Sequence, residues 1–266
     1  MFEMLKRALL TTLIFLMPFS QSAADILDNI IERGTLRVGV TLFEPNTMQD
    51  ATGKLTGFDI EVANKLTKDL GVEPEFLVYN WADIITALKN REIDIILAGV
   101  AITPARALNL NFSQPYSELG IGIATNTRMT RKITKLGDLN TPKYSIAVVS
   151  DTVSHDFVRR NFDQAQIKTY KTSEEAGSAV SQDKAHVFVA SVPQPKFLSL
   201  SHPSKVDSPL TKPLVSYKVG MGVSKGEQEW LNFLNSWITA RQADKWLSTT
   251  HKYWYDSLRW RKEGKK

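Results

Sequence analysis

Strand-like and helix-like segments alternate along this chain, and this alternation limits the fold more than any other feature. Thr35–Val40 is a short apolar run typical of a buried strand, and Phe58–Leu70 repeats apolar residues along one helical face. Pro74–Val78 and Ile93–Leu97 are further predicted strands, with a short helix at Trp81–Lys89 between them. This β-α-β-α-β order predicts a parallel sheet covered by helices.

The second half of the chain repeats this order with different residues. It predicts the strands Tyr144–Val149, Ile167–Tyr170, His186–Val189 and Val219–Val223, and the helices Asp151–Asn161, Glu174–Gln182 (capped by Ser173), Glu227–Ala240 and Gln242–Trp254. Two α/β halves predict two lobes, each with a mostly parallel sheet flanked by helices. Ligands bind such sheets beyond the C-terminal ends of the strands, so a cleft between the lobes is the expected site.

The segment Asp94–Tyr116 contains the first candidate binding residue. After the strand, Gly99 removes side-chain bulk, Thr103 is a good helix N-cap and Pro104 suits the first helical position. Arg106 then falls in the first turn of that helix. A guanidinium beside free helix N–H groups is suited to a carboxylate. The alternative is that Arg106 pairs with an acidic neighbour in a surface network.

The N-terminus predicts export from the cytoplasm. Lys6 and Arg7 precede the apolar segment Ala8–Phe19, and small residues up to Ala24 suit cleavage there. We expect residues 1–24 to be a signal peptide, because the apolar segment is too short to span a membrane. The chain has no cysteine, so neither disulfides nor a lipid-modified cysteine at the cleavage site is expected. A soluble protein of a bacterial periplasm, without a lipid anchor, fits these features.

Charge and histidine patterns argue against several kinds of partner. The net charge is +5, and much of the excess lies in the basic C-terminal tail, residues 255–266, which we expect to be solvated. Trp260 in this tail is the one hint of extra contacts. The sequence has no interleaved basic and aromatic motif of the kind that binds nucleic acid. The histidines lack the spacing of metal ligands, so we expect no metal and no cofactor.

Five motifs occur in a fixed order along the chain. They are RGTLRVGV, DATGKLTGFDIEVANKL, YNWADIITALKNREIDIILAGVAITPAR, FSQPY and HKYW, at residues 33–40, 50–66, 79–106, 112–116 and 251–254. This ordered set resembles the periplasmic solute-binding proteins of polar amino-acid uptake systems, solute-binding protein family 3 with the type II Venus-flytrap fold. The resemblance covers residues 34–254.

The resemblance implies how the chain is divided and how it works. Lobe 1 would comprise residues 25–117 and 220–254, and lobe 2 residues 118–219, with two hinge crossings near 117–121 and 216–220. A small ligand would enter the open cleft, and the lobes would close on it by hinge motion. An ABC permease of the inner membrane would recognise the closed form, and the binding protein itself is expected to be a monomer.

The resemblance also implies roles for residues of the cleft. Arg106 would hold the ligand carboxylate, while Trp81 and Phe43 match positions where aromatic rings enclose the ligand side chain. The structural alternative for Trp81 is a core or helix-start aromatic. Further ligand contacts are expected from Gly99, Ala101 and Thr152.

Departures from the family pattern concern the ligand. The acidic residue that holds the ligand's ammonium should fall near Ser191, where no Asp or Glu is close. A buried ammonium needs a counter-charge or several acceptors, so Glu44 or Asp151 would have to replace that acid. Otherwise the ligand is a carboxylate without an amino group. Asp151 could instead cap its helix.

Three functions are consistent with these residues. The first is a receptor for a small carboxylate-bearing solute, an amino acid or related organic acid, which would not be an enzyme. The second is an enzyme similar to cyclohexadienyl or prephenate dehydratases, which need a carboxylic acid near the cleft; Glu44 and Asp151 are the candidates. The third is an accessory or sensory binding protein outside transport.

Overall fold

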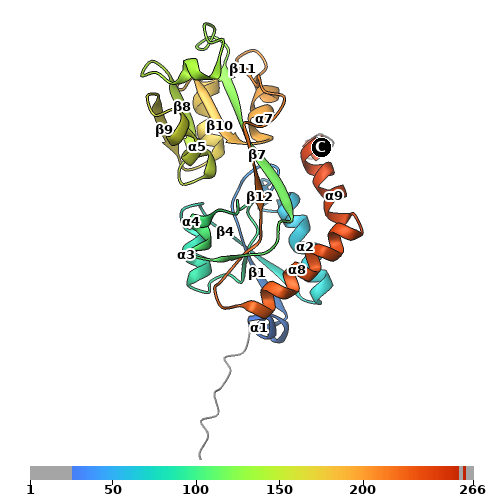
Figure 1. Cartoon of the computed structure of the whole chain (residues 1–266). Coiled ribbons are helices and arrows are strands. Elements are labelled where there is room, and N and C mark those ends of the chain that lie inside the picture. The colour runs from blue at the N-terminus through green and yellow to red at the C-terminus, as the bar shows by residue number, and fades with distance from the viewer. Residues whose placement is uncertain (1–25, 258–259, 262–266) are drawn as a thin grey trace, which may run out of the picture.

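The computed structural model describes residues 26–257, 260 and 261. The predicted signal peptide and much of the basic tail therefore lie outside the described residues. Within the described part, two β-sheets lie towards opposite ends of an elongated molecule, and helices pack against both of them (Figure 1). The two-lobed α/β architecture predicted from the sequence is confirmed.

The first sheet has the strand order β4-β1-β5-β13-β6. Its strands are β1 (Thr35–Val40), β4 (Glu73–Val78), β5 (Ile95–Ile96), β6 (Asn111–Phe112) and β13 (Gly222–Val223). β1 pairs in parallel with β4 and β5, whereas β13 pairs antiparallel with β5 and β6. The prediction of a single late strand at Val219–Val223 is wrong. The chain forms two strands here: β13 belongs to this sheet, and β12 (Val215–Val219) belongs to the other.

Helices from both ends of the chain cover the first sheet (Figure 1). They are α1 (Ile26–Arg33), α2 (Phe58–Leu70), α3 (Ile84–Lys89), α4 (Pro104–Ala107), α8 (Gln228–Ala243), α9 (Trp246–His251) and the π-helical segment η2 (Lys252–Asp256). α2 has the predicted bounds and ends at Gly71, whose φ of 75° is left-handed. The helix expected at Gln242–Trp254 starts later, since Lys245 has a φ of 64° and separates α8 from α9.

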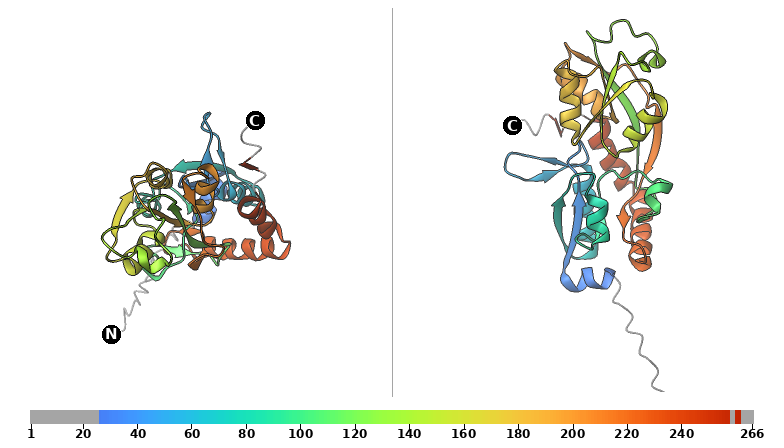
Figure 2. Two further views of the ribbon diagram at one scale, coloured as in Figure 1. Left: turned by 90° about the horizontal axis from the view of Figure 1, so that it is seen from above. Right: turned by 90° about the vertical axis from the view of Figure 1, so that its left-hand side faces the viewer.

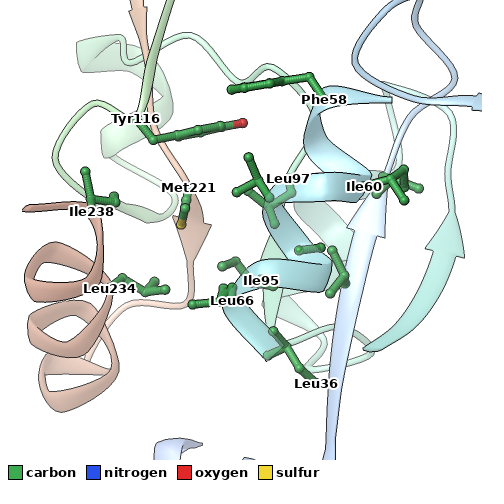
Figure 3. Packing of buried hydrophobic residues seen from close by; sticks show 14 of the residues in the cluster. Leu36, Phe58, Ile60, Leu66, Ile95, Leu97, Tyr116, Met221, Leu234 and Ile238 are labelled. Atoms are coloured by element: carbon green, nitrogen blue, oxygen red, sulfur yellow. The ribbon is translucent and has the colours of Figure 1, made fainter. Parts of the chain in front are cut away.

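Burial of the predicted helix faces forms the main core. Leu66 of α2 and Ile95 of β5 are fully buried, and Leu234 of α8 packs in the same cluster. Figure 3 shows these side chains pointing toward one another from three different elements. Burying aliphatic side chains of this size contributes about 1.5–3 kcal/mol each.

The second sheet has the order β11-β7-β10-β8-β9, with β12 also paired to β7. Its other strands are β7 (Ser117–Asn126), β8 (Ser145–Val149), β9 (Gln166–Tyr170), β10 (Val187–Ser191) and β11 (Val206–Asp207). β8 pairs in parallel with β9 and β10, and β7 pairs antiparallel with β10, β11 and β12. Each sheet thus combines three parallel strands with antiparallel ones.

Three α-helices and a 3₁₀-helix accompany the second sheet. They are α5 (Val153–Asn161), α6 (Ser173–Ser181), α7 (Gln194–Ser201) and η1 (Leu136–Leu139). Ser173 is not the cap of α6: the Thr172 side chain accepts from the Glu175 N–H, and the Glu175 carboxylate accepts from the Thr172 N–H in return. α7 forms in a Pro-containing stretch for which no helix was predicted.

Two long segments join the sheets. β7 and β12 pair along residues 117–121 and 215–219 and run from the first sheet into the second (Figure 1). The end of β12 is tied to the loop after β5, because the Ile102 N–H donates to the Lys218 carbonyl at 2.9 Å and the Gly220 N–H to the Val100 carbonyl at 3.1 Å. A small hairpin, β2 (Met48–Gln49) and β3 (Leu55–Thr56), projects from the first sheet's side of the molecule (Figure 2).

Trp260 and Arg261, here called the C-terminal clasp, connect the two halves. The indole of Trp260 is 7% exposed and lies 5.3 Å from the ring of Trp254 and 5.6 Å from that of Phe197 on α7. Arg261 lies 4.5 Å over the Phe197 ring and pairs with Glu44 at 3.2 Å. These two residues of the basic tail are therefore packed rather than solvated.

Candidate functional site

A cavity of about 230 Å³ lies between the two sheets. Its walls are the segments that follow β1, β4 and β5 on one side and β8, β9 and β10 on the other, together with Tyr217 of β12. These are the C-terminal ends of the parallel strands, where ligands bind in open α/β sheets. Seven predicted site residues line the cavity: Phe43, Trp81, Gly99, Ala101, Arg106, Thr152 and Ser191.

Arg106 lies in the cavity wall on the short helix α4. Thr103 caps that helix by accepting from the Arg106 N–H at 3.3 Å, which fixes where the side chain starts. The guanidinium donates to the Ala101 carbonyl at 3.2 Å and the Asp151 carbonyl at 3.4 Å. Burial lowers the pKa of Arg106. Among the described residues, no carboxylate forms an ion pair with Arg106.

Trp81 and Arg106 connect the two halves across the cavity. The guanidinium lies 4.6 Å over the indole ring, a cation–π arrangement, and the indole N–H donates to the Asp151 carbonyl at 2.8 Å. Asp151 has a φ of 60° and precedes α5 in the opposite wall. It contributes its backbone oxygen here, and its carboxylate does not line the cavity. Thr152 caps α5, since its hydroxyl accepts from the His155 N–H at 3.2 Å.

Gly99 allows the backbone to approach an aromatic ring closely. Its φ is 59°, and a Cβ atom here would lie 2.6 Å from Cε1 of Phe43 and 3.1 Å from Nδ2 of Asn46. No side chain fits at that distance without displacing the Phe43 ring. The glycine therefore sets the position of Phe43 against this wall of the cavity.

A buried carboxylate supports this wall from behind. Asp59 accepts from the Asn46 amide at 2.9 Å, from the Tyr116 hydroxyl at 2.7 Å and from the Gly99 N–H. Burial raises the pKa of Asp59 to about 6, and these hydrogen bonds oppose that rise. The Tyr255 hydroxyl donates to Asn46 in turn at 2.7 Å. Asp59 holds the cavity wall and does not itself line the cavity.

Ser191 lies where the ammonium-binding acid was expected. Its hydroxyl forms a hydrogen bond with the hydroxyl of Tyr217. Burial raises the pKa of Tyr217 to about 12, so the phenol is neutral near pH 7. Both groups are uncharged, and because only one of the two hydroxyls donates in this bond, the other O–H remains available.

Several cavity residues were missed by the sequence analysis, and three of them carry polar side chains that matter below. Lys171 and Gln194 follow β9 and β10, and Tyr217 lies on β12. The rule that ligands lie beyond C-terminal strand ends points to Lys171, since it directly follows the predicted strand Ile167–Tyr170. Nothing in the sequence places Tyr217 in the cavity, because that requires the pairing of β12 with β7.

Glu44 does not line the cavity. It therefore does not replace the ammonium-binding acid that is missing at Ser191. Its carboxylate pairs with Arg261 of the C-terminal clasp. Burial raises the pKa of Glu44, and the charge of Arg261 opposes that rise. Because the side chain turns toward the clasp, the described cavity walls contain no Asp or Glu side chain.

Comparison with known proteins agrees with this geometry. The family model of the bacterial extracellular solute-binding proteins, family 3, matches residues 36–257. The chain belongs to this family. Solved structures similar to the chain share the two-lobed type II architecture described above, and the relatives named as binding proteins confirm the predicted role as a solute-binding protein.

Relatives of this family 3 protein include binding proteins for amino acids. It is 27% identical to the L-cystine-binding protein TcyJ of Escherichia coli K12 over 241 residues, which is 88% of each chain. The crystal structure of the ancestral amino acid-binding protein AncCDT-1, a precursor of cyclohexadienyl dehydratase, is 32% identical with a TM-score of 0.80. That comparison covers 87% of this chain and all of the other.

One relative is an enzyme. The cyclohexadienyl dehydratase of Pseudomonas aeruginosa PAO1 is 24% identical over 184 residues, 69% of each chain. The enzyme alternative raised by the sequence therefore has a relative, at lower identity than the binding proteins named above.

Two further observations concern membranes and metals. Among residues 26–257, 260 and 261, no helix has the length and apolar character needed to cross a bilayer. The same residues hold no group of three or more His, Cys, Asp or Glu side chains arranged to bind a metal ion.

Proposed function

We propose that this family 3 protein is the periplasmic substrate-binding component of an ABC-type uptake system. It binds a small carboxylate-bearing solute between its lobes and closes on it, with Arg106 as the carboxylate-binding group. The closed form is then recognised by an inner-membrane permease, and the binding protein acts as a monomer without a lipid anchor. Residues 1–24 are removed on export.

The observation that carries the proposal is the partly buried guanidinium of Arg106, which forms no ion pair with a carboxylate of the described residues. A cation taken out of water requires an anionic partner or strong acceptors. Arg106 has two backbone carbonyls and the Trp81 ring, but no carboxylate of the described residues. A planar guanidinium binds a carboxylate bidentately, so a ligand carboxylate supplies the missing charge.

The aromatic residues favour a ligand with an apolar body. Phe43 and Trp81 enter the cavity from the segments after β1 and β4, and Arg106 lies over the Trp81 ring. A ligand whose carboxylate is at Arg106 would therefore place its remaining atoms beside these rings.

A dehydratase function is less well supported by the cavity. Protonation of a leaving hydroxyl needs a positioned carboxylic acid. Of the two candidates, Glu44 pairs with Arg261, and Asp151 turns only its carbonyl toward Arg106 and Trp81. Incubation with prephenate or arogenate checks this directly: product formation would favour the enzyme.

The test uses the mature chain, residues 25–266, in a thermal-shift screen followed by calorimetry. The panel holds amino acids, mono- and dicarboxylates, keto acids and small amines. A ligand that binds only the folded protein raises the melting temperature. We expect carboxylates to stabilise the protein and amines without a carboxylate to have no effect.

Arg106→Gln is the matching variant, and it should lose on the order of 3–5 kcal/mol of binding free energy. Arg160→Gln, on the outer part of α5, is the control because Arg160 is exposed and lies outside the cavity. Equal affinities of Arg106→Gln and the unmodified protein for a carboxylate ligand would contradict the proposed role.

A further inference from the structure

The charges that line the cavity all have one sign. Among the described residues in its walls, Arg106 and Lys171 are the only charged side chains, and the other polar groups are hydroxyls and amides. Such a cavity attracts anions and disfavours a cationic group of the ligand.

Lys171 stands at the end of β9, in the wall opposite Arg106. Its backbone N–H is bonded to the Glu175 carboxylate at 3.1 Å as part of the cap of α6, which fixes the chain at this point. None of the ion pairs among the described residues involves the Lys171 ammonium. Lys171 is exposed to solvent and contributes to the lining of the cavity, so it is a second cation at the cavity without an ion pair among the described residues.

The cavity walls of the described residues lack a carboxylate that could balance the charge of a ligand ammonium. Ser191 and Tyr217 bond to each other, and both are neutral. Gln194 is 8% exposed, and its amide oxygen accepts from the Ser173 hydroxyl at 3.3 Å, which leaves its N–H groups as donors. Donors of this kind suit a carboxylate oxygen better than an ammonium.

We propose that the ligand is a small dicarboxylate without an ammonium group, with one carboxylate at Arg106 and the other at Lys171. This assignment rests on the proposed function and narrows it. Both negative charges of the ligand then meet an unpaired cation, and no buried ammonium is left without a counter-charge.

Calorimetry with glutarate, 2-oxoglutarate, L-glutamate, L-lysine and butyrate tests the assignment. Glutarate or 2-oxoglutarate should bind more tightly than L-glutamate, because glutamate adds an ammonium near two cations. L-Lysine should not bind. Lys171→Gln should weaken dicarboxylate binding about tenfold, corresponding to one lost charge contact, and should weaken butyrate binding clearly less.

Lys196→Gln is the matched control, since Lys196 is exposed on α7 and lies outside the cavity. It should bind dicarboxylates like the unmodified protein, and both variants should keep the unmodified melting temperature. Tighter binding of L-glutamate than of glutarate, or an unchanged dicarboxylate affinity of Lys171→Gln, overturns the dicarboxylate assignment. If any carboxylate still binds in an Arg106-dependent manner, the proposed function stands even though the dicarboxylate assignment fails. If no carboxylate binds at all, the dicarboxylate assignment and the proposed function are both overturned.

Discussion

Asp59 illustrates how a residue outside the cavity can determine its shape. It has no exposed surface, and it joins the Asn46 amide, the Tyr116 hydroxyl and the Gly99 N–H in one network. The carboxylate of Asp59 thereby fixes the loop that carries Gly99.

Asp59 should make stability depend on pH. Its pKa is about 6 in the folded protein, against 3.8 for an aspartate in water. Because the pKa of Asp59 is higher in the folded than in the unfolded protein, protonated Asp59 stabilises the fold. This stabilisation is complete below pH 3.8 and is lost as the pH rises through 6. The free energy of unfolding should therefore fall by about 3 kcal/mol over this window through Asp59. Denaturant titrations at several pH values measure this, and Asp59→Asn should remove that part of the slope.

Parallel pH profiles for the unmodified protein and Asp59→Asn would contradict the assignment. The slope with pH is compared, and not the absolute stability of Asp59→Asn. The amide N–H₂ of the variant faces the donor of Asn46 or Tyr116, and this loss of a hydrogen bond lowers stability at every pH.

Gly99→Ala should lower the stability of the folded protein more than Gly34→Ala does. Gly99 and Gly34 both have positive φ, 59° and 69°, but a Cβ at Gly34 has no atom within 4 Å. Gly34→Ala therefore carries only the backbone cost of about 1 kcal/mol, whereas Gly99→Ala also displaces Phe43. Melting temperatures of the two variants compare these costs. A ligand affinity that falls in Gly99→Ala but not in Gly34→Ala would locate the effect in the cavity, and equal effects would show that the contact with Phe43 is unimportant.

At the scale of elements, the short helix α4 presents Arg106. Thr103→Val removes the side-chain oxygen that caps this helix while keeping the side-chain size. Loss of a cap costs about 1 kcal/mol, and the looser helix should weaken carboxylate binding. Thr86→Val on α3 is the control, because Thr86 is exposed in mid-helix. Calorimetry should separate the two variants; equal binding would mean that the cap does not position Arg106.

The elements also show what the sequence could predict. β1 and α2 have their predicted bounds because local apolar spacing and Gly71 determine them. The residues around Val219–Val223 were assigned to one strand, because nothing local reveals that the chain changes sheets between β12 and β13. Motif and strand order placed Arg106 and Trp81 at one cavity, whereas Tyr217 depends on distant strand pairing and could not be placed.

At the scale of the whole molecule, the C-terminal clasp links the halves on the outside of the cavity. Trp260 packs on Trp254 and Phe197, and Arg261 pairs with Glu44. Opening of the lobes would move α7 away from these residues. The clasp should therefore favour the closed arrangement, which is the arrangement that a ligand also favours.

Trp260→Ala should shift the ligand-free protein toward more open forms. Small-angle scattering should give a larger radius of gyration, and ligand affinity should fall because closing is less favourable. Glu44→Gln should have a smaller effect, below about 1 kcal/mol, because the Glu44–Arg261 pair is partly exposed. An unchanged radius and affinity in Trp260→Ala would show that the clasp does not restrain the lobes.

The two sheets are formed by different parts of the chain, and this determines the order in which they can assemble during synthesis. All strands of the second sheet lie between residues 117 and 219, whereas the first sheet needs β13 and its core needs α8 near the C-terminus. During synthesis from the N-terminus, the second sheet can thus form while the first still lacks its central antiparallel strand. The half that carries Arg106 and Trp81 is completed last, so the cavity comes into existence only when nearly the whole chain has emerged.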